Sequence, residues 1–275
     1  MPLQFGLLLA VGRDVHPEEM SSMDAIAKAV SGKTESYLGD RTCGELVEAF
    51  YPLIVDDILQ NRQVNRDTLR PWLEDLKKIA DNCGILPSRK EGRAANIWDL
   101  GSDVKLVLQG TDGFNQAMTP YAVAELLNAN VVSVENAFYP KMVIGINSRS
   151  EHVEIAKDFL RFALSEELQS VDTYEGFPVN AKALETQAAA DRSMAEAYTT
   201  YDIDGSTAEF AIKAYSEETA KQLMDLCKTA TLCLKEDTQI EISLTESLQA
   251  YLNGQASVEE AMDAVEGSLK MYLAE

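Results

Sequence analysis

The sequence predicts an α/β fold that is rich in helices. Most of the chain carries apolar residues at helical spacing, often directly behind a residue type that caps helices. Short apolar runs bounded by turn residues stand between these segments and are typical of strands. Helices that alternate with isolated strands indicate an α/β protein with a helix-heavy surface. The 275 residues suffice for one large domain or two modest ones.

The N-terminal third predicts a strand and two helices. Residues 5–12 form an apolar run, and Arg13 follows the run instead of preceding it, which favours a buried strand over a signal segment. Thr42 and Glu45 have the spacing of a capping box, so a helix is expected to begin there. A second helix is expected from Asn65, with Trp72 on its buried stripe.

The middle of the chain predicts short elements. In order they are a polar loop at 88–93, a strand at 104–108, a turn at 110–113, a short helix at 122–128 and a strand at 131–134. Residues 141–147 form the clearest strand, because they are nearly all apolar, as in a strand that is buried on both faces. We expect residues 141–146 to be a buried strand that connects two lobes.

The C-terminal part is expected to be helical. Helices are predicted from Ser150, from Ser165, over the alanine-rich residues 181–200 and from Ser216, with a turn at 176–179. The last two helices are expected at 238–253 and 258–273, broken at Gly254 and packed as a pair. We expect this pair because apolar residues recur every three or four positions along both segments, as in helices that bury one face.

The charge balance excludes two kinds of partner. The chain has 24 Lys and Arg against 45 Asp and Glu, a net charge of −21. Such an acidic surface repels nucleic acids and anionic lipid surfaces. A direct membrane span is not expected either, because no run of 18 apolar residues occurs.

The histidines and cysteines argue against an enzyme. His16 and His152 are predicted in the polar first turns of helices, which leaves no placed imidazole for the common hydrolytic schemes. The cysteines lack metal-binding spacing, and they are Cys43, Cys83, Cys227 and Cys233. We therefore expect no catalysis, no metal and no cofactor. A hydrolase that works with carboxylates alone stays open as a third alternative.

Two stretches of sequence carry a resemblance to a known family. The first runs through YPKMVIGINS (139–148), IAKDFLRFALSEELQ (155–169) and GFPVN (176–180), and the second is LQAYLNGQASVEEAM (248–262). Their order and spacing resemble the C-terminal half of family 1 extracellular solute-binding proteins, the maltose-binding-like receptors of ABC importers. The resemblance covers roughly residues 100–275 well and residues 40–99 loosely.

The resemblance implies a periplasmic-binding-protein type II-like fold in two lobes. It implies a main α/β lobe at 1–145 that ends in a hinge strand, a helical part of the other lobe at 146–235, and a helical return to the main lobe at 236–275. Family members usually carry a further βαβ region, which this sequence does not contain. The chain is then either a fragment lacking most of the N-terminal lobe or a reduced member of the family.

The implied function is that of a non-catalytic receptor that delivers a small polar solute, expected to be a saccharide, to the membrane permease of an ABC importer. The implied location is extracellular or periplasmic, with a lipoprotein anchor on a signal segment that this sequence lacks. The alternative from another class is an intracellular, acidic, helical interaction protein without a ligand.

Aromatic residues are the first candidates for a sugar site, because aromatic rings stack on sugars and carboxylates accept bonds from sugar hydroxyls. The predicted ligand-binding residues lie near the implied hinge and cleft, and they are Trp98, Phe114, Tyr121, Tyr139, Phe177 and Glu241. Each has a plainer alternative. Phe177 can pack under its own turn, and Glu241 can be a solvated residue of a helix.

Overall fold

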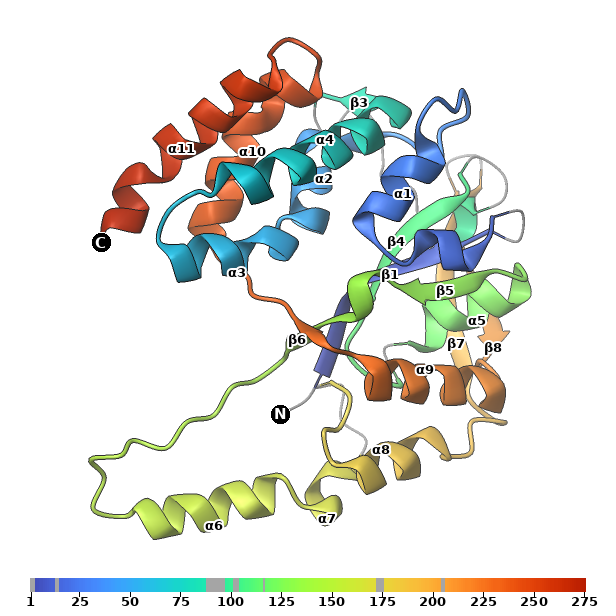
Figure 1. Cartoon of the computed structure of the whole chain (residues 1–275). Helices are drawn as coiled ribbons and strands as arrows, with labels where there is room; N and C mark the ends of the chain where they lie inside the picture. The colour runs from blue at the N-terminus through green and yellow to red at the C-terminus, as the bar shows by residue number, and fades with distance from the viewer. Residues whose placement is uncertain are drawn as a thin grey trace. The chain divides into compact units, whose positions relative to one another are not determined.

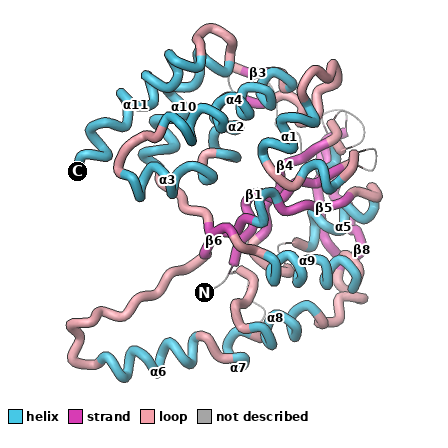
Figure 2. Tube along the Cα trace, in the orientation of Figure 1, coloured by secondary structure: helices cyan, strands magenta, loops and turns pink. Residues whose placement is uncertain are grey.

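The computed structural model describes residues 3–12, 15–87, 97–100, 104–115, 117–171, 176–203 and 206–275. Within these residues the chain is α/β and rich in helices, as predicted (Figures 1 and 2). The loop predicted at 88–93 lies outside the described residues.

Contacts divide the chain into two compact units. Unit 1 comprises Met1–Gly6, Gly110–Leu126 and Asn136–Cys233, and unit 2 comprises Leu7–Gln109, Leu127–Glu135 and Leu234–Glu275. Both units are therefore assembled from segments that are distant in sequence. The three segments expected at 1–145, 146–235 and 236–275 stay a prediction.

The described residues of unit 2 form six α-helices (Figure 1). These are α1 (Met23–Val30), α2 (Cys43–Phe50), α3 (Pro52–Asn61), α4 (Arg66–Asn82), α10 (Thr238–Leu252) and α11 (Val258–Ala274). The capping box at Thr42 and Glu45 is present at the start of α2, as predicted. Trp72 is buried in α4, and its indole Nε1 donates a hydrogen bond to the carbonyl oxygen of Phe50 at 3.1 Å.

Helices α10 and α11 form the predicted pair. The apolar stripes of both helices are buried, and they consist of Leu244, Leu248, Leu252, Met262, Val265 and Leu269. The chain turns at Gly254, whose φ of +73° favours glycine. Ser257 and Glu260 form a second capping box at the start of α11. The prediction of two helices broken at Gly254 is confirmed.

The strands of unit 2 are short. Residues 8–11 of β1 (Leu3–Val11) pair antiparallel with β5 (Asn130–Ser133), with Leu8 opposite Ser133. The two-residue strands β2 (Arg41–Thr42) and β3 (Ile85–Leu86) pair in parallel. Strand β4 (Leu106–Thr111) begins in unit 2 and ends in unit 1, and short 3-10 helices lie at Pro17–Met20, at Ile97–Asp99 and, ending in unit 1, at Val134–Asn136. The strands expected at 5–12, 104–108 and 131–134 are thus confirmed, with boundaries shifted by a few residues.

Unit 1 combines helices with short strand pairs. Its helices are α5 (Met118–Leu126), α6 (Val153–Ala163), α7 (Glu166–Gln169), α8 (Ala181–Ala188) and α9 (Glu217–Thr229). Strand β6 (Ala137–Pro140) pairs antiparallel with the start of β1 and parallel with β9 (Leu232–Cys233). Strands β7 (Glu196–Ile203) and β8 (Ser206–Lys213) form an antiparallel hairpin.

The prediction of a buried strand at residues 141–146 is wrong. Strand β6 ends at Pro140, and the chain then runs on as an irregular segment, drawn as a loop in Figure 2. Met142, Val143 and Ile144 are exposed. In the described part of the chain, the segment lacks a neighbouring strand, and an apolar run becomes a strand only when such a partner satisfies its main chain.

The prediction of a helix over 181–200 is wrong in its second half. Helix α8 ends at Ala188, and the guanidinium of Arg192 binds carbonyl groups at this end. Its two terminal nitrogens donate to the carbonyl oxygens of Gln187, Ala188 and Ala190, at 2.6, 3.2 and 2.9 Å. These contacts satisfy carbonyls that a helix end leaves unpaired. The aromatic and β-branched residues that follow form β7.

Candidate functional site

The described residues of unit 2 form an acidic pocket where α2 faces α10. Its volume is about 290 Å³. It is lined by Thr42, Gly44, Glu45, Glu48, Glu241, Ile242, Thr245 and Glu246. The pocket therefore includes Glu241, one of the six residues predicted to bind a ligand.

Local sequence signals place the two walls of the pocket. At the start of α2, the Thr42 hydroxyl oxygen accepts from the main-chain N–H of Glu45 at 3.2 Å, and a Glu45 carboxylate oxygen accepts from the main-chain N–H of Thr42 at 2.8 Å. At the start of α10, Asp237 accepts from the N–H of Ile240 at 2.9 Å. A Cβ atom at Gly44 would lie 3.6 Å from Cγ2 of Thr245, so the glycine leaves open space that a side chain would fill.

The pocket is strongly negative. Four of the eight described lining residues are glutamates, and none of these eight is a lysine or an arginine. The negative charge of one of these glutamates, Glu241, affects the pKa of Tyr51. Burial raises the pKa of the Tyr51 hydroxyl, and the negative charges of Glu241 and Glu236 raise it further, because they oppose formation of a phenolate. The glutamates of the lining therefore disfavour an anionic ligand.

The lining of the pocket suits a small ligand with hydroxyl groups. Carboxylates accept hydrogen bonds, and the threonine hydroxyls both donate and accept. The volume lies near the lower end of the range for ligand sites, about 300 Å³. None of the eight described lining residues is aromatic, so these residues do not provide the ring stacking expected for a sugar. Among the described residues, no group of His, Cys, Asp and Glu is arranged to hold a metal ion.

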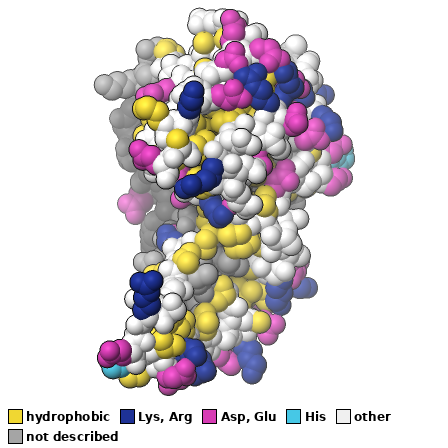
Figure 3. All heavy atoms as spheres, turned by 60° about the vertical axis from the view of Figure 1, so that its left-hand side comes forward, with side chains coloured by type: hydrophobic (Ala, Val, Ile, Leu, Met, Phe, Trp, Pro, Cys, Tyr) yellow, Lys and Arg dark blue, Asp and Glu magenta, His cyan; other side chains and the backbone are white. Residues whose placement is uncertain are grey.

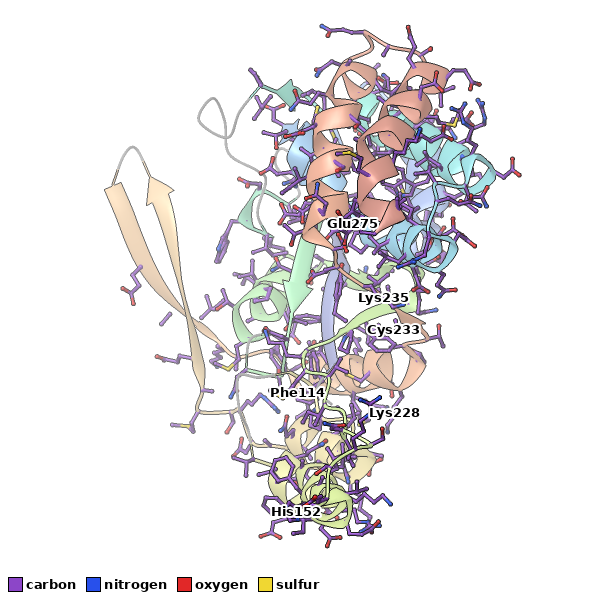
Figure 4. All side chains as sticks on the ribbon, turned by 90° about the vertical axis from the view of Figure 1, so that its left-hand side faces the viewer. Phe114, His152, Lys228, Cys233, Lys235 and Glu275 are labelled. Atoms are coloured by element: carbon purple, nitrogen blue, oxygen red, sulfur yellow. The ribbon has the colours of Figure 1, made fainter. Side chains whose placement is uncertain are left out.

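Three of the predicted aromatic residues lie in the interior of unit 1. Phe114, Tyr121 and Phe177 are at most 3% exposed, and Figure 4 labels Phe114. The Phe114 and Phe177 rings pack edge to face, with centroids 5.0 Å apart. Because the rings are buried, they present no face to solvent in this conformation. The structure therefore gives Phe177 the packing role that was its alternative.

Tyr215 and Arg192 complete this aromatic cluster. The Tyr215 hydroxyl donates to the carbonyl oxygen of Phe114 at 2.7 Å, and the Tyr215 ring packs against Tyr121 with centroids 6.2 Å apart. The guanidinium carbon of Arg192 lies 5.3 Å from the centre of the Phe114 ring and 5.5 Å from that of Tyr215. The cluster therefore has the contacts of a packed core stabilised by a cation.

The other two aromatic candidates are half-buried. Tyr139 lies on β6 in unit 1, and Trp98 lies in the 3-10 helix Ile97–Asp99 of unit 2. The six predicted residues are thus divided between the units, with Glu241 in the acidic pocket. The sequence reasoning missed Glu45 and Thr245 as pocket residues. The Thr42–Glu45 capping box was recognised, but only as the start of a helix.

The histidines and buried thiols lack the features of catalytic groups. His16 is exposed, and His152 lies exposed ahead of α6 (Figure 4), as predicted. In the part of the chain that the structure describes, the cysteines form no disulfide. Burial raises the pKa of Cys83 to about 12 and also raises the pKa values of Cys43 and Cys227. A thiol with a raised pKa is a weak nucleophile at neutral pH.

Comparison with known proteins finds a likeness to solved structures. No protein-family model matches the chain, and no curated protein matches it. Among solved structures, the chain is similar to a sugar transporter from Rhizobium etli in an open conformation. The match has a TM-score of 0.54 and 15% sequence identity, and it covers 98% of this chain and 70% of that one. At this identity, the likeness concerns the fold.

The comparison corrects the predicted function. The matched protein is described as a sugar transporter, not as a solute-binding receptor. The prediction of an extracellular receptor that delivers its solute to an ABC importer is therefore withdrawn. Among the described residues, none of the helices has both the length and the apolar character that crossing a membrane requires.

Proposed function

We propose that this chain takes part in carbohydrate transport and that it contacts a sugar without chemically altering it. The observation that carries the proposal is the likeness of nearly the whole chain, 98%, to a sugar transporter. We further propose that the chain has a fold of the periplasmic-binding-protein type II. A membrane permease as partner, and a location outside the cytoplasm, rest on the sequence resemblance alone.

The acidic pocket of unit 2 is the place that we assign to the sugar. Glu241 and Thr245 come from α10, and Thr42 and Glu45 come from the start of α2, so acceptors and donors line two walls. A sugar hydroxyl can donate to a carboxylate and accept from a threonine hydroxyl at once. Charge-assisted bonds of this kind are roughly twice as strong as neutral ones. The negative lining favours a neutral sugar over a phosphorylated one.

Calorimetric titration with a panel of neutral monosaccharides and oligosaccharides tests the proposal. The matched variants are Glu241→Gln, which removes one charge from the pocket, and Glu209→Gln, which removes one from an exposed position on β8 of the other unit. We expect a neutral sugar to bind, Glu241→Gln to weaken the binding about tenfold, and Glu209→Gln to leave it unchanged.

Three outcomes would each contradict a different part of the proposal. If no sugar of the panel binds at millimolar concentration, contact with a sugar is wrong. If a sugar binds equally to both variants, the sugar contact stands, but its assignment to the pocket at Glu241 is wrong. Release of a hydrolysed product during the titration would replace the non-catalytic role by that of a hydrolase.

A further inference from the structure

Helix α6 of unit 1 carries an apolar face that nothing in the described chain covers. The helix has no buried residue, although apolar side chains occupy more than half of its eleven positions. Ile155, Phe159 and Phe162 recur at helical spacing, and they are 68%, 59% and 52% exposed. An amphipathic helix of a folded protein normally buries such a stripe against a neighbour.

The segment that precedes α6 is also apolar and without a partner. Met142, Val143 and Ile144 are exposed, and a Cβ atom at Gly145 would meet no atom within 4 Å. In the described part of the chain, the main chain of residues 142–146 makes no hydrogen bond to another segment. Unsatisfied N–H and C=O groups beside apolar side chains are a template for pairing with another strand.

We call residues 142–171 the apolar arm. Figure 1 shows its first segment and α6 running in opposite directions on either side of a bend, and Figure 3 shows hydrophobic side chains on the surface of this region. The exposed large apolar side chains of the arm are Met142, Val143, Ile144, Ile155, Phe159, Phe162, Leu164, Leu168 and Val171.

The summed exposed area of these side chains is larger than the largest apolar patch on a typical monomer. Large apolar side chains present on the order of 150–200 Å² each, and those of the arm are about half exposed, which sums to roughly 900 Å². The largest apolar patch on a typical monomer is about 300–600 Å². A stable protein–protein interface buries about 800 Å² on each partner. The arm alone therefore supplies the area that a stable dimer needs.

We propose that the apolar arm is the interface of a homodimer, in which the arm of a second copy of this chain covers it. Residues 142–146 of the two copies pair as antiparallel strands across a twofold axis, and the α6 stripe of each copy is covered by the other arm. A twofold axis brings the same patch of both copies together, so a strand-like segment can pair with itself about Ile144.

The charges on α6 permit this contact despite the net charge of the chain. Lys157 pairs with Glu154 at 2.7 Å, and Arg161 pairs with Asp158 at 2.5 Å. The net charge of −21 repels a second copy at long range. Salt screens that repulsion but leaves the apolar contact intact, so the dimer becomes tighter as salt increases.

Sedimentation velocity on the full chain tests the interface, from about 1 to about 100 μM at 0.05 and 0.3 M salt. The wild type is expected to reach twice its monomer mass of 30.3 kDa. Phe159→Glu and Val143→Pro are expected to raise the dissociation constant about 100-fold, since one buries a charge in the interface and the other removes a strand N–H. Met194→Glu is the matched control, because Met194 is 92% exposed and lies outside the arm.

A second readout follows the segment itself. Amide exchange of residues 142–146 is expected to slow as the wild-type concentration rises and to remain fast in Phe159→Glu. The proposal is overturned if the wild type stays monomeric at every concentration and salt level. It is equally overturned if Phe159→Glu and Val143→Pro associate as tightly as the Met194→Glu control, because the interface then lies elsewhere.

Discussion

The ring of Phe177 packs edge to face against the ring of Phe114, with centroids 5.0 Å apart and planes at 79°. The contact joins the turn after β4 to the segment before α8, which are more than sixty residues apart in sequence. Both rings are at most 1% exposed, so the pair lies in the core of unit 1. Edge-to-face pairs add stability beyond the area that they bury.

Replacing Phe177 by alanine is therefore expected to destabilise the protein by about 3–5 kcal/mol, through lost burial and the cavity left behind. Denaturant unfolding monitored by circular dichroism measures the change, and Met194→Ala, at a 92% exposed position, serves as the control with a change below about 0.5 kcal/mol. If Phe177→Ala left the stability unchanged but weakened sugar binding, Phe177 would be a ligand-binding residue and not a core residue.

Leu248 on α10 gives a parallel prediction for unit 2. The side chain is fully buried, on the stripe that the helix shares with Leu244 and Leu252. Leu248→Ala is expected to cost about 2–5 kcal/mol of unfolding free energy. Met271→Ala on α11 is the matched control, because Met271 is 82% exposed and its loss should change stability by less than about 0.5 kcal/mol. Equal effects of the two variants would show that the stripe is not core.

The helices of unit 2 could be predicted because their signals are local. In α11 a capping box at Ser257 and Glu260, a glycine turn at Gly254 and a regular apolar stripe all agree. Each signal acts within a few residues, so the local sequence is sufficient to predict the helix and its ends. The strand expected at 141–147 failed because a strand depends on a partner elsewhere, and periodicity within one segment does not report that partner.

The candidate site could be predicted only in part, for a related reason. The residue types that bind sugars were picked from loops near the implied cleft, but burial is decided by contacts between distant segments. Phe114 and Phe177 cover each other, and Tyr215, which was not considered, bonds to the Phe114 carbonyl. Glu241 was singled out, yet the residues opposite it in the pocket, Thr42 and Glu45, come from about two hundred positions earlier in the chain.

The capping box of α11 predicts a pH dependence. The Glu260 carboxylate accepts from the main-chain N–H of Ser257 at 2.7 Å and from its hydroxyl at 2.8 Å, and these bonds lower the pKa of Glu260 below its usual value of 4.5. A lowered pKa means that the folded state prefers the charged form. This contribution to stability is complete above about pH 4.5 and is lost as the pH falls through the folded pKa.

Thermal unfolding from about pH 6 to about pH 3 measures this effect. The wild type is expected to lose stability more steeply than Glu260→Gln, because a neutral amide accepts the same bonds but does not titrate. Glu209→Gln, at an exposed position on β8, should follow the wild type. Identical slopes for the wild type and Glu260→Gln would mean that the capping bonds do not depend on the charge.

Two tyrosines of unit 1 offer a matched pair for the last prediction. Tyr121 and Tyr215 are both at most 3% exposed, and their rings are in contact. The Tyr215 hydroxyl donates to the Phe114 carbonyl at 2.7 Å, whereas the Tyr121 hydroxyl has no hydrogen-bond partner among the described residues. Accordingly, burial raises the pKa of Tyr121 far above its usual value.

The same substitution is therefore expected to act in opposite directions at these two positions. Tyr215→Phe removes one hydrogen bond and leaves a carbonyl unsatisfied, which should cost about 1–2 kcal/mol of unfolding free energy. Tyr121→Phe removes a buried hydroxyl that has nothing to bond, so it should be neutral or stabilise the protein by up to about 1 kcal/mol. Urea unfolding of both variants beside the wild type measures the difference, and the shape of each ring is retained. A loss at Tyr121 as large as that at Tyr215 would mean that an ordered water molecule satisfies the Tyr121 hydroxyl, because a bridging water stabilises a buried hydroxyl nearly as well as a direct bond.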